Sequence, residues 1–159
     1  KQVLNSNWVS VVPTNVYGPS DNFHLEDGHM IPSMIHRAFL SNKNKEKMVV
    51  WGDGSPLRQV IYSEDLAKLI IWSLDNWKND EPFMAVNPNE ITILEVAKEI
   101  CNNFNISEDD LIFDESKPKG QHRKPAVSDA PLEFKFTPLS EGIKKSIKWF
   151  LKNYPNIRK

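Results

Sequence analysis

The residue best suited to proton transfer in this sequence is a histidine in a polar loop that precedes a predicted helix. His29 follows Gly28 directly. A histidine in such a loop can donate or accept a proton near neutral pH, although it can equally be an ordinary polar loop residue. His24 and His122 carry no stronger signal, and His36 is predicted to be solvated on the polar side of its helix. His29 is therefore the candidate for proton transfer.

A second group of residues consists of cations from separate segments. Arg37 lies beside the apolar stripe of a predicted helix, and Arg58 enters a strand after a glycine-rich turn. One long loop contributes the others, which are Lys117, Lys119, Arg123 and Lys124. Arginines from separate elements can hold a diphosphate through bidentate hydrogen bonds. The alternative is a set of surface cations that balance the 21 acidic residues.

One aromatic residue could contact a ligand, and several common catalytic and binding motifs are missing from the sequence. Trp51 ends a predicted strand, where it could stack on a base or sugar or belong to the core. The sequence contains no G-x-G-x-x-G, no Tyr-x-x-x-Lys, no Gly-x-Ser-x-Gly and no cluster with metal-ligand spacing. Cys101 falls on an apolar helix face and is predicted to be an inert buried thiol. The residues alone thus give no complete catalytic constellation.

The elements that carry these residues are predicted to alternate between strands and helices. Short apolar runs predict strands at 8–13, 48–51, 59–62, 83–87 and 111–113, the first of them buried. Helical spacing follows 31–39, and three further helices are predicted at 63–77, 92–104 and 137–151. This alternation indicates an α/β fold with some parallel strand pairing.

The ends and buried faces of the predicted helices can also be read from the sequence. Thr92 and Glu95 form a capping box, and Ser63 is a suitable N-cap. The buried stripe of the helix after Ser63 is predicted to be Leu66, Leu69, Ile70, Leu74 and Trp77. In the last helix, the inward residues are predicted to be Ile143, Ile147, Phe150 and Leu151.

Length and composition set the class of protein. A chain of 159 residues with 40% apolar residues predicts one globular domain. The net charge of −1 gives no reason to expect nucleic acid or a membrane surface as a partner. No apolar run approaches the roughly 20 residues of a membrane span, and the lone Cys101 predicts a reducing compartment such as the cytoplasm. The start at Lys1, directly before a strand, predicts a piece of a longer protein.

Two sets of motifs are spaced along residues 11–124. The first set is Pro13-Thr14-Asn15-Val16-Tyr17-Gly18-Pro19, Gly52-Asp53-Gly54 through Arg58 to Ile61-Tyr62-x-x-Asp65-Leu66-Ala67, and Asn87-Pro88 before Thr92-Ile93-x-Glu95-x-Ala97. The second set is Pro19-Ser20-Asp21-Asn22-Phe23, Gly28-His29-x-Ile31-Pro32, Val50-Trp51-Gly52-x-Gly54-x-Pro56-x-Arg58, and Phe113-Asp114-x-Ser116-Lys117-Pro118-x-Gly120-x-x-Arg123-Lys124. On the first set, the chain resembles the C-terminal half of extended short-chain dehydrogenases/reductases that act on nucleotide sugars. On the second, it is similar to the members that convert GDP-4-keto-6-deoxy-D-mannose to GDP-L-fucose.

The resemblance implies a fold. Residues 1–159 would form a single C-terminal substrate-binding domain, with a small mixed sheet and flanking helices. Residues 1–20 would include one strand of a Rossmann sheet, the rest of which belongs to a missing N-terminal half. The full-length enzyme would be a homodimer.

The resemblance also implies a reaction and a set of site residues. Carbons 3 and 5 of the sugar would be epimerised through enolate-like intermediates, and NADPH would then reduce the 4-keto group. His29 would be the acid in epimerisation, paired with a cysteine of the missing half that is not Cys101. The NADP site would include Pro13, Thr14, Asn15, Val16 and His29. The GDP-sugar would be held by Arg37, Trp51, Arg58 and Lys124.

Three features limit or rival this interpretation. Most of the NADPH site would lie in the missing half, so the chain alone would bind the GDP-sugar without being active. Lys119 stands where the family usually carries Asp, which affects one contact to the nucleotide. The rivals are another NAD(P)-dependent nucleotide-sugar epimerase or dehydratase, distinguished by Gly28-His29 together with Arg58, and a non-catalytic sugar-nucleotide binding module.

Overall fold

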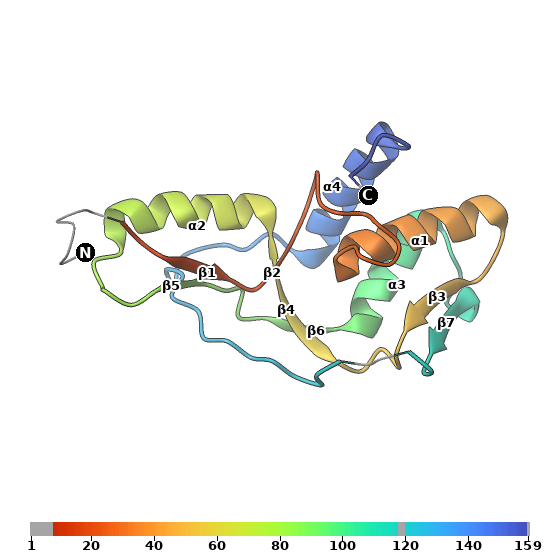
Figure 1. Cartoon of the computed structure of the whole chain (residues 1–159), viewed down its shortest axis with the longest axis horizontal. Helices are drawn as coiled ribbons and strands as arrows, with labels where there is room; N and C mark the ends of the chain where they lie inside the picture. Colours follow the sequence, from red (N-terminus) through yellow and green to blue (C-terminus); the bar gives the residue numbers. More distant parts are fainter. Residues whose placement is uncertain (1–7, 118–119, 159) are drawn as a thin grey trace.

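The computed structural model describes residues 8–117 and 120–158 and shows the predicted alternation of strands and helices (Figure 1). In chain order the elements are β1 (Val11–Pro13), β2 (Asn15–Tyr17), α1 (Met30–Asn44), β3 (Met48–Trp51), β4 (Leu57–Tyr62), α2 (Ser63–Asn76), β5 (Phe83–Ala85), β6 (Glu90–Thr92), α3 (Ile93–Phe104), the 3-10 helix η1 (Glu108–Asp110), β7 (Leu111–Asp114) and α4 (Leu139–Asn153). The α/β class is confirmed.

The strands form small sheets of mixed direction. β1 pairs with β5 in parallel, with Val11 opposite Phe83, and β3 pairs with β7 in parallel. β2 pairs with β4 in parallel, with Asn15 opposite Val60, and β4 pairs with β6 in the antiparallel direction. β4 is the central strand of this sheet. It lies between β2, which leads into the polar loop, and β6, which leads into the capping box at the start of α3.

Two apolar clusters hold the fold together. The larger one packs α1, α3 and α4 against β3, around side chains such as Ile35, Ile100 and Phe150. The smaller one lies under α2 and contains Leu69 and Phe83. Figure 1 shows α2 toward one end of an elongated molecule and α1, α3 and β3 toward the other, with β4 running between them. No helix within the described ranges is both long and apolar enough to cross a membrane.

Burial predictions were wrong in four elements. The first strand spans only Val11–Pro13, and Val12 is 42% exposed because Val11 packs on the smaller cluster and the next side chain along a strand points to the opposite face. Leu69 of α2 is buried as predicted, but Ile70 and Leu74 are exposed, because the helix turns Asp65 and Ser73 inward beside Leu69. On α4, Leu151 is half-exposed.

His36 on α1 is the most informative of the wrong predictions. It is only 5% exposed, and its Nδ1 lies 2.8 Å from the carbonyl oxygen of Phe23, to which it donates a hydrogen bond. Its ring also packs against Phe150 and Tyr154. His36 therefore joins the loop after β2 to the core through α1, a role that helical periodicity does not indicate for a polar residue.

Two other local predictions agree with the structure. Thr92 and Glu95 form a reciprocal capping box at the start of α3. Cys101 is buried, and this burial raises the pKa of its thiol to about 11, as an inert thiol requires. The predicted N-cap of α2 was wrong, because Tyr62 occupies that position and Ser63 is the first helical residue.

Candidate functional site

His29 lies at the start of α1, at the end of a loop that is held by its own hydrogen bonds. Its backbone is extended and occupies the N-cap position, and its side chain is 70% exposed. Its Nδ1 lies 2.9 Å from Oδ1 of Asp21, a carboxylate that is only 14% exposed. The same carboxylate oxygen accepts a hydrogen bond of 2.7 Å from the backbone N–H of Asn22. The exposed histidine therefore rests on a largely buried acid.

His24, in the same loop, has a structural part. Its Nδ1 accepts hydrogen bonds from the backbone N–H of Asp27 at 2.9 Å and of Glu26 at 3.3 Å. Gly28 is required beside it, because a Cβ at that position would lie 2.2 Å from the carbonyl oxygen of His24. Two histidines that look equivalent in the sequence are thus separated by their contacts, and His29 has the ring that projects to solvent.

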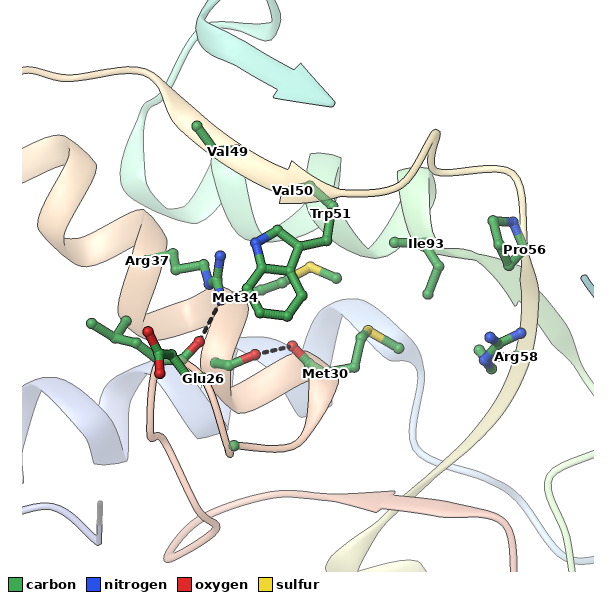
Figure 2. Close-up of a pocket in the computed structure, with 13 residues that line it drawn as sticks. Glu26, Met30, Met34, Arg37, Val49, Val50, Trp51, Pro56, Arg58 and Ile93 are labelled. Carbon is green, nitrogen blue, oxygen red and sulfur yellow. Dashed lines mark hydrogen bonds between the residues drawn. The ribbon is translucent and has the colours of Figure 1, made fainter. Parts of the chain in front are cut away.

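Arg37 and Trp51 form a cation–aromatic pair on one wall of a hollow of about 280 Å³, here called the Trp51 hollow (Figure 2). The guanidinium carbon of Arg37 lies 4.5 Å from the ring centroid of Trp51, and its Nη2 donates to the carbonyl oxygen of Leu25. Lys117 Nζ lies 5.7 Å from the same centroid. Burial lowers the pKa of the Arg37 guanidinium, which Glu26 partly offsets, yet arginine remains a cation at neutral pH.

The sequence allows Trp51 either a core role or a stacking role. It is 42% exposed and ends β3 at the rim of the Trp51 hollow, so it is not a core residue. Figure 2 shows Arg37 and Trp51 side by side, with Arg58 across the hollow. This arrangement provides an aromatic surface and two cations around a space that opens to solvent.

Arg58 lines the Trp51 hollow and two neighbouring hollows. The His29 hollow, of about 370 Å³, is lined by Thr14, Asn15, Val16, His29 and Arg58 among others. The Lys124 hollow, of about 620 Å³, includes Pro13, Thr14, Asn15, Arg58 and Lys124. Ligand sites in proteins commonly measure roughly 300–1,000 Å³, so the three hollows together offer room for a nucleotide-sized molecule. Every residue that the resemblance assigns to the NADP or GDP-sugar site lines at least one of them.

The loop that carries Lys124 is fixed at several points next to Arg58. Arg58 Nη1 donates to the carbonyl oxygen of Gln121 at 2.8 Å and to that of Leu57 at 2.7 Å. The side-chain amide of Gln59, which is 5% exposed, accepts from the N–H of Ala126 at 2.8 Å and donates to its carbonyl oxygen at 3.1 Å. The backbone after Lys124 is thereby held beside β4.

Arg123 does not join the candidate phosphate site. Its Nε lies 2.9 and 3.0 Å from the two carboxylate oxygens of Glu90, so it ties the loop to β6. This hydrogen-bonded pair holds the pKa of the Glu90 carboxyl below its usual range. Lys119 lies outside the described residues. Of the predicted cations, Arg37, Arg58 and Lys124 line the hollows, and Lys117 reaches Trp51.

The sequence reasoning missed Asp21, Gln59 and Glu90. A signal existed for Gln59, because a polar residue inside an otherwise apolar strand needs a buried partner. Asp21 and Glu90 gave no such signal, because their partners are eight and 33 residues away.

Thr14 carries an unsatisfied polar atom at the boundary of the His29 and Lys124 hollows. Its Oγ1 is buried and has no hydrogen-bond partner among the described residues. A buried hydroxyl without a partner is satisfied when a polar ligand binds beside it. Residues 8–117 and 120–158 contain no group of three or more side chains that could together bind a metal ion.

Comparisons with known proteins agree with the motifs. Residues 1–87 match the NAD dependent epimerase/dehydratase family. The chain is 42% identical over 158 residues to a GDP-L-fucose synthase of Dictyostelium discoideum and 40% identical over 166 residues to a probable GDP-L-fucose synthase of Drosophila melanogaster. These alignments cover 96% of this chain and 49% and 51% of the two relatives, so the chain spans about half their length.

A solved structure is similar in fold as well as in sequence. A GDP-L-fucose synthetase from Naegleria fowleri bound to NADP superposes with a TM-score of 0.90 at 38% identity. The match covers 95% of this chain and 49% of that one.

Proposed function

Because the chain belongs to the NAD dependent epimerase/dehydratase family, we propose that it is the substrate-binding, C-terminal part of a GDP-L-fucose synthase. The complete enzyme would convert GDP-4-keto-6-deoxy-D-mannose to GDP-L-fucose with NADPH, as a cytoplasmic homodimer. The relatives and the solved structure carry this name, and the motifs around His29 and Arg58 point to the same group.

The observation that carries the proposal is the meeting of three hollows at Arg58. On one side lie Arg37 and Trp51, on another lies His29, and Lys124 lies on the third. A sugar nucleotide has a base, a diphosphate and a reacting sugar, and it needs contacts of these different kinds within one molecule's length. We assign Arg37, Trp51, Arg58 and Lys124 to the GDP-sugar, with arginine as the bidentate phosphate donor.

The proton transfer is assigned to His29. In the epimerisation, the protonated ring donates its Nε2 proton to the enolate carbon, and the exposed ring then recovers a proton from water. Gly28 and the hydrogen bonds of His24 fix the loop, so the His29 ring has a constant position at the His29 hollow.

The cofactor wall is assigned to the segment before the loop. Pro13, Thr14, Asn15, Val16 and His29 would contact NADP, and the unpaired hydroxyl of Thr14 fits a polar group of such a ligand. When bound, NADPH supplies the hydride for reduction of the 4-keto group. This chain contributes part of that wall and no G-x-G-x-x-G.

The activity is tested with the full-length protein, GDP-4-keto-6-deoxy-D-mannose and NADPH in deuterated water. We expect deuterium at carbons 3 and 5, oxidation of NADPH, and a product that coelutes with GDP-L-fucose. Turnover without deuterium at either carbon would leave a reductase that does not epimerise and would contradict the proposal.

The role of His29 is tested in the same assay with His29→Gln. Glutamine keeps hydrogen bonding but cannot transfer a proton, so epimerisation should slow by roughly 10²–10⁴-fold. Binding of GDP, measured by calorimetry, should stay within a few-fold. His122→Gln is the matched control, because His122 is exposed and lines none of the three hollows. Exchange at the parent rate in His29→Gln would remove His29 from the reaction.

A further inference from the structure

We propose that Asp21 is a positioning residue that sets the tautomer and the direction of the His29 ring. This inference rests on the proposed function for its catalytic part, while the contact itself can be tested without turnover. The ring of His29 has its only hydrogen bond to a described residue at Asp21, over 2.9 Å from Nδ1 to Oδ1. The rest of the ring is exposed, so this one contact decides where Nε2 points.

Asp21 is itself held in place by the turn. Ser20, before it, adopts the left-handed conformation with φ of 62°. The backbone N–H of Asn22 donates to Asp21 Oδ1 at 2.7 Å, and the Asn22 side chain donates to the carbonyl oxygen of Asp27 at 3.2 Å. The carboxylate is 14% exposed, whereas Asp27 in the same loop is 89% exposed. A fixed acid beneath an exposed ring is the arrangement that positions a histidine.

The chemistry of the contact determines the tautomer. An ionised carboxylate can only accept hydrogen bonds, so the Nδ1 of His29 must carry the proton that faces Asp21. The nitrogen that changes its protonation state is then Nε2, on the outer side of the ring. When the ring acts as an acid, the Nε2–H bond breaks and a C–H bond forms at the enolate carbon. The electron pair of the broken bond stays on Nε2, and the ring is left neutral with its proton on Nδ1.

Without Asp21, nothing among the described residues would favour this form. A neutral imidazole with its proton on Nε2 has a lone pair on Nδ1, which faces the loop and not the ligand. In this form Nε2 already holds its proton and cannot take one up, and donating that proton requires Nδ1 to be protonated first. Loss of Asp21 should therefore slow proton transfer without weakening nucleotide binding, since Arg37, Trp51 and Arg58 are on other elements.

The first test measures the tautomer directly in the full-length protein. Histidine labelled with ¹⁵N gives distinct shifts for protonated and unprotonated ring nitrogens, at a pH where the ring is neutral. We expect His29 to carry its proton on Nδ1, and Asp21→Asn to shift the population toward Nε2. Asp27→Asn is the matched control and should leave the His29 signals unchanged. A parent protein with its proton on Nε2 would overturn the proposal whatever the enzyme does.

The second test measures proton transfer. Asp21→Asn should lower the rate of deuterium incorporation at carbons 3 and 5 by roughly 10–100-fold, the size usual for a group that orients a functional histidine. The affinity for GDP should stay within a few-fold, and Asp27→Asn should match the parent. An equal loss of GDP binding would show that Asp21 only holds the loop together, and this would overturn the proposal. Should Asp21→Asn not fold, Asp21→Glu displaces the carboxylate by one methylene and takes its place in both tests.

The two proposals fail differently. If the parent incorporates no deuterium, the proposed function is wrong, and the ring tautomer alone decides whether Asp21 holds His29. If the parent incorporates deuterium and Asp21→Asn does so at the same rate, the function stands and the role of Asp21 is refuted.

Discussion

Arg58 has contacts of two kinds, and a substitution will affect both. Its Nη1 is bound to backbone carbonyl oxygens, while the side chain lines all three hollows. The guanidinium fork can therefore hold the loop and still offer donors to a ligand. A lysine would keep the charge but lose the fixed geometry.

We expect Arg58→Ala in the full-length enzyme to weaken GDP binding by about ten- to a hundredfold. A charge-assisted hydrogen bond contributes roughly 1.5–3 kcal/mol, which corresponds to that range. The loss of affinity for NADP should be smaller. The GDP affinity of Arg58→Lys should lie between those of the parent and of Arg58→Ala. The control Lys43→Ala, on the exposed end of α1, should bind GDP as the parent does. Calorimetry with GDP and NADP separately gives the answer, and an equal loss for both ligands would contradict the assignment to the GDP-sugar.

Single residues show how far sequence reasoning reaches. His29, Arg58 and Trp51 could be selected, because their types and their places after strands or turns suggest chemistry. The separation of His29 from His24 could not be predicted, because it depends on which backbone N–H groups each ring faces. The sequence groups Arg123 with the candidate phosphate ligands, because no nearby residue indicates that its partner is Glu90, 33 residues away.

At the scale of elements, the capping box at the start of α3 is a purely local device. The Thr92 hydroxyl accepts from the N–H of Glu95 at 3.0 Å, and the Glu95 carboxylate accepts from the N–H of Thr92 at 2.7 Å. Thr92→Ala should lower the free energy of unfolding by about 1 kcal/mol. Thr92→Ser keeps the hydroxyl and is the control.

The same box predicts a pH dependence. The hydrogen bonds from the backbone N–H and hydroxyl of Thr92 lower the pKa of the Glu95 carboxyl below its unfolded value. A depressed pKa in the folded state stabilises the protein above the unfolded value of roughly 4.3, and this contribution disappears as the pH falls through the folded value. Urea unfolding of parent and Thr92→Ala at pH 7 and pH 3 should show a smaller difference at pH 3. A difference that stays constant would mean that the carboxylate adds nothing.

Gln59 on β4 hydrogen-bonds the backbone of the loop around Ala126, as a neighbouring strand would. Its buried amide pairs with both the N–H and the carbonyl oxygen of Ala126. Gln59→Leu leaves both groups unpaired, so unfolding should become easier by roughly 1–3 kcal/mol, and the Ala126 amide should exchange faster with solvent. Gln121→Leu alters an exposed amide in the same loop and should change neither quantity. Unaltered exchange at Ala126 in Gln59→Leu would refute this anchor.

Element faces were harder to predict than element positions. The box of α3 lies within four residues, so its sequence is sufficient to identify it. The buried side of α2 depends on the packing of β4 and β5, and the helix turns Asp65 inward to bond the N–H and hydroxyl of Thr137. Periodicity favoured Ile70 and Leu74, and both are exposed.

At the scale of the whole molecule, α4 is packed against the strand that begins the site. A Cβ added to Gly142 would lie 2.2 Å from the hydroxyl oxygen of Tyr17 at the end of β2. Tyr17 is 3% exposed, and its burial together with the charge of Asp65 raises the pKa of its phenol, which stays neutral. The last helix and the residues before the His29 loop are thus fitted to each other across the molecule.

Gly142→Ala should therefore destabilise the protein despite the better helix propensity of alanine. Propensity favours alanine by about 1 kcal/mol, but overpacking a buried contact costs about 1–3 kcal/mol, and the large overlap here should make the net change unfavourable. In a Tyr17→Phe background the hydroxyl is absent, so the same substitution should cost less. A double-mutant cycle by urea unfolding measures this coupling, and a cost that is equal in both backgrounds would exclude the Tyr17 hydroxyl as its cause.

The position of Arg58 at the meeting of three hollows also limits how this site can diversify. A substitution at a residue that lines several binding surfaces is pleiotropic. A change that improves binding of a new sugar nucleotide on one surface also alters binding on the surfaces beside it. Trp51 and Lys124 each line one hollow. New specificity should therefore be reached first through those two positions, by evolution or by directed selection, while Arg58 stays constant.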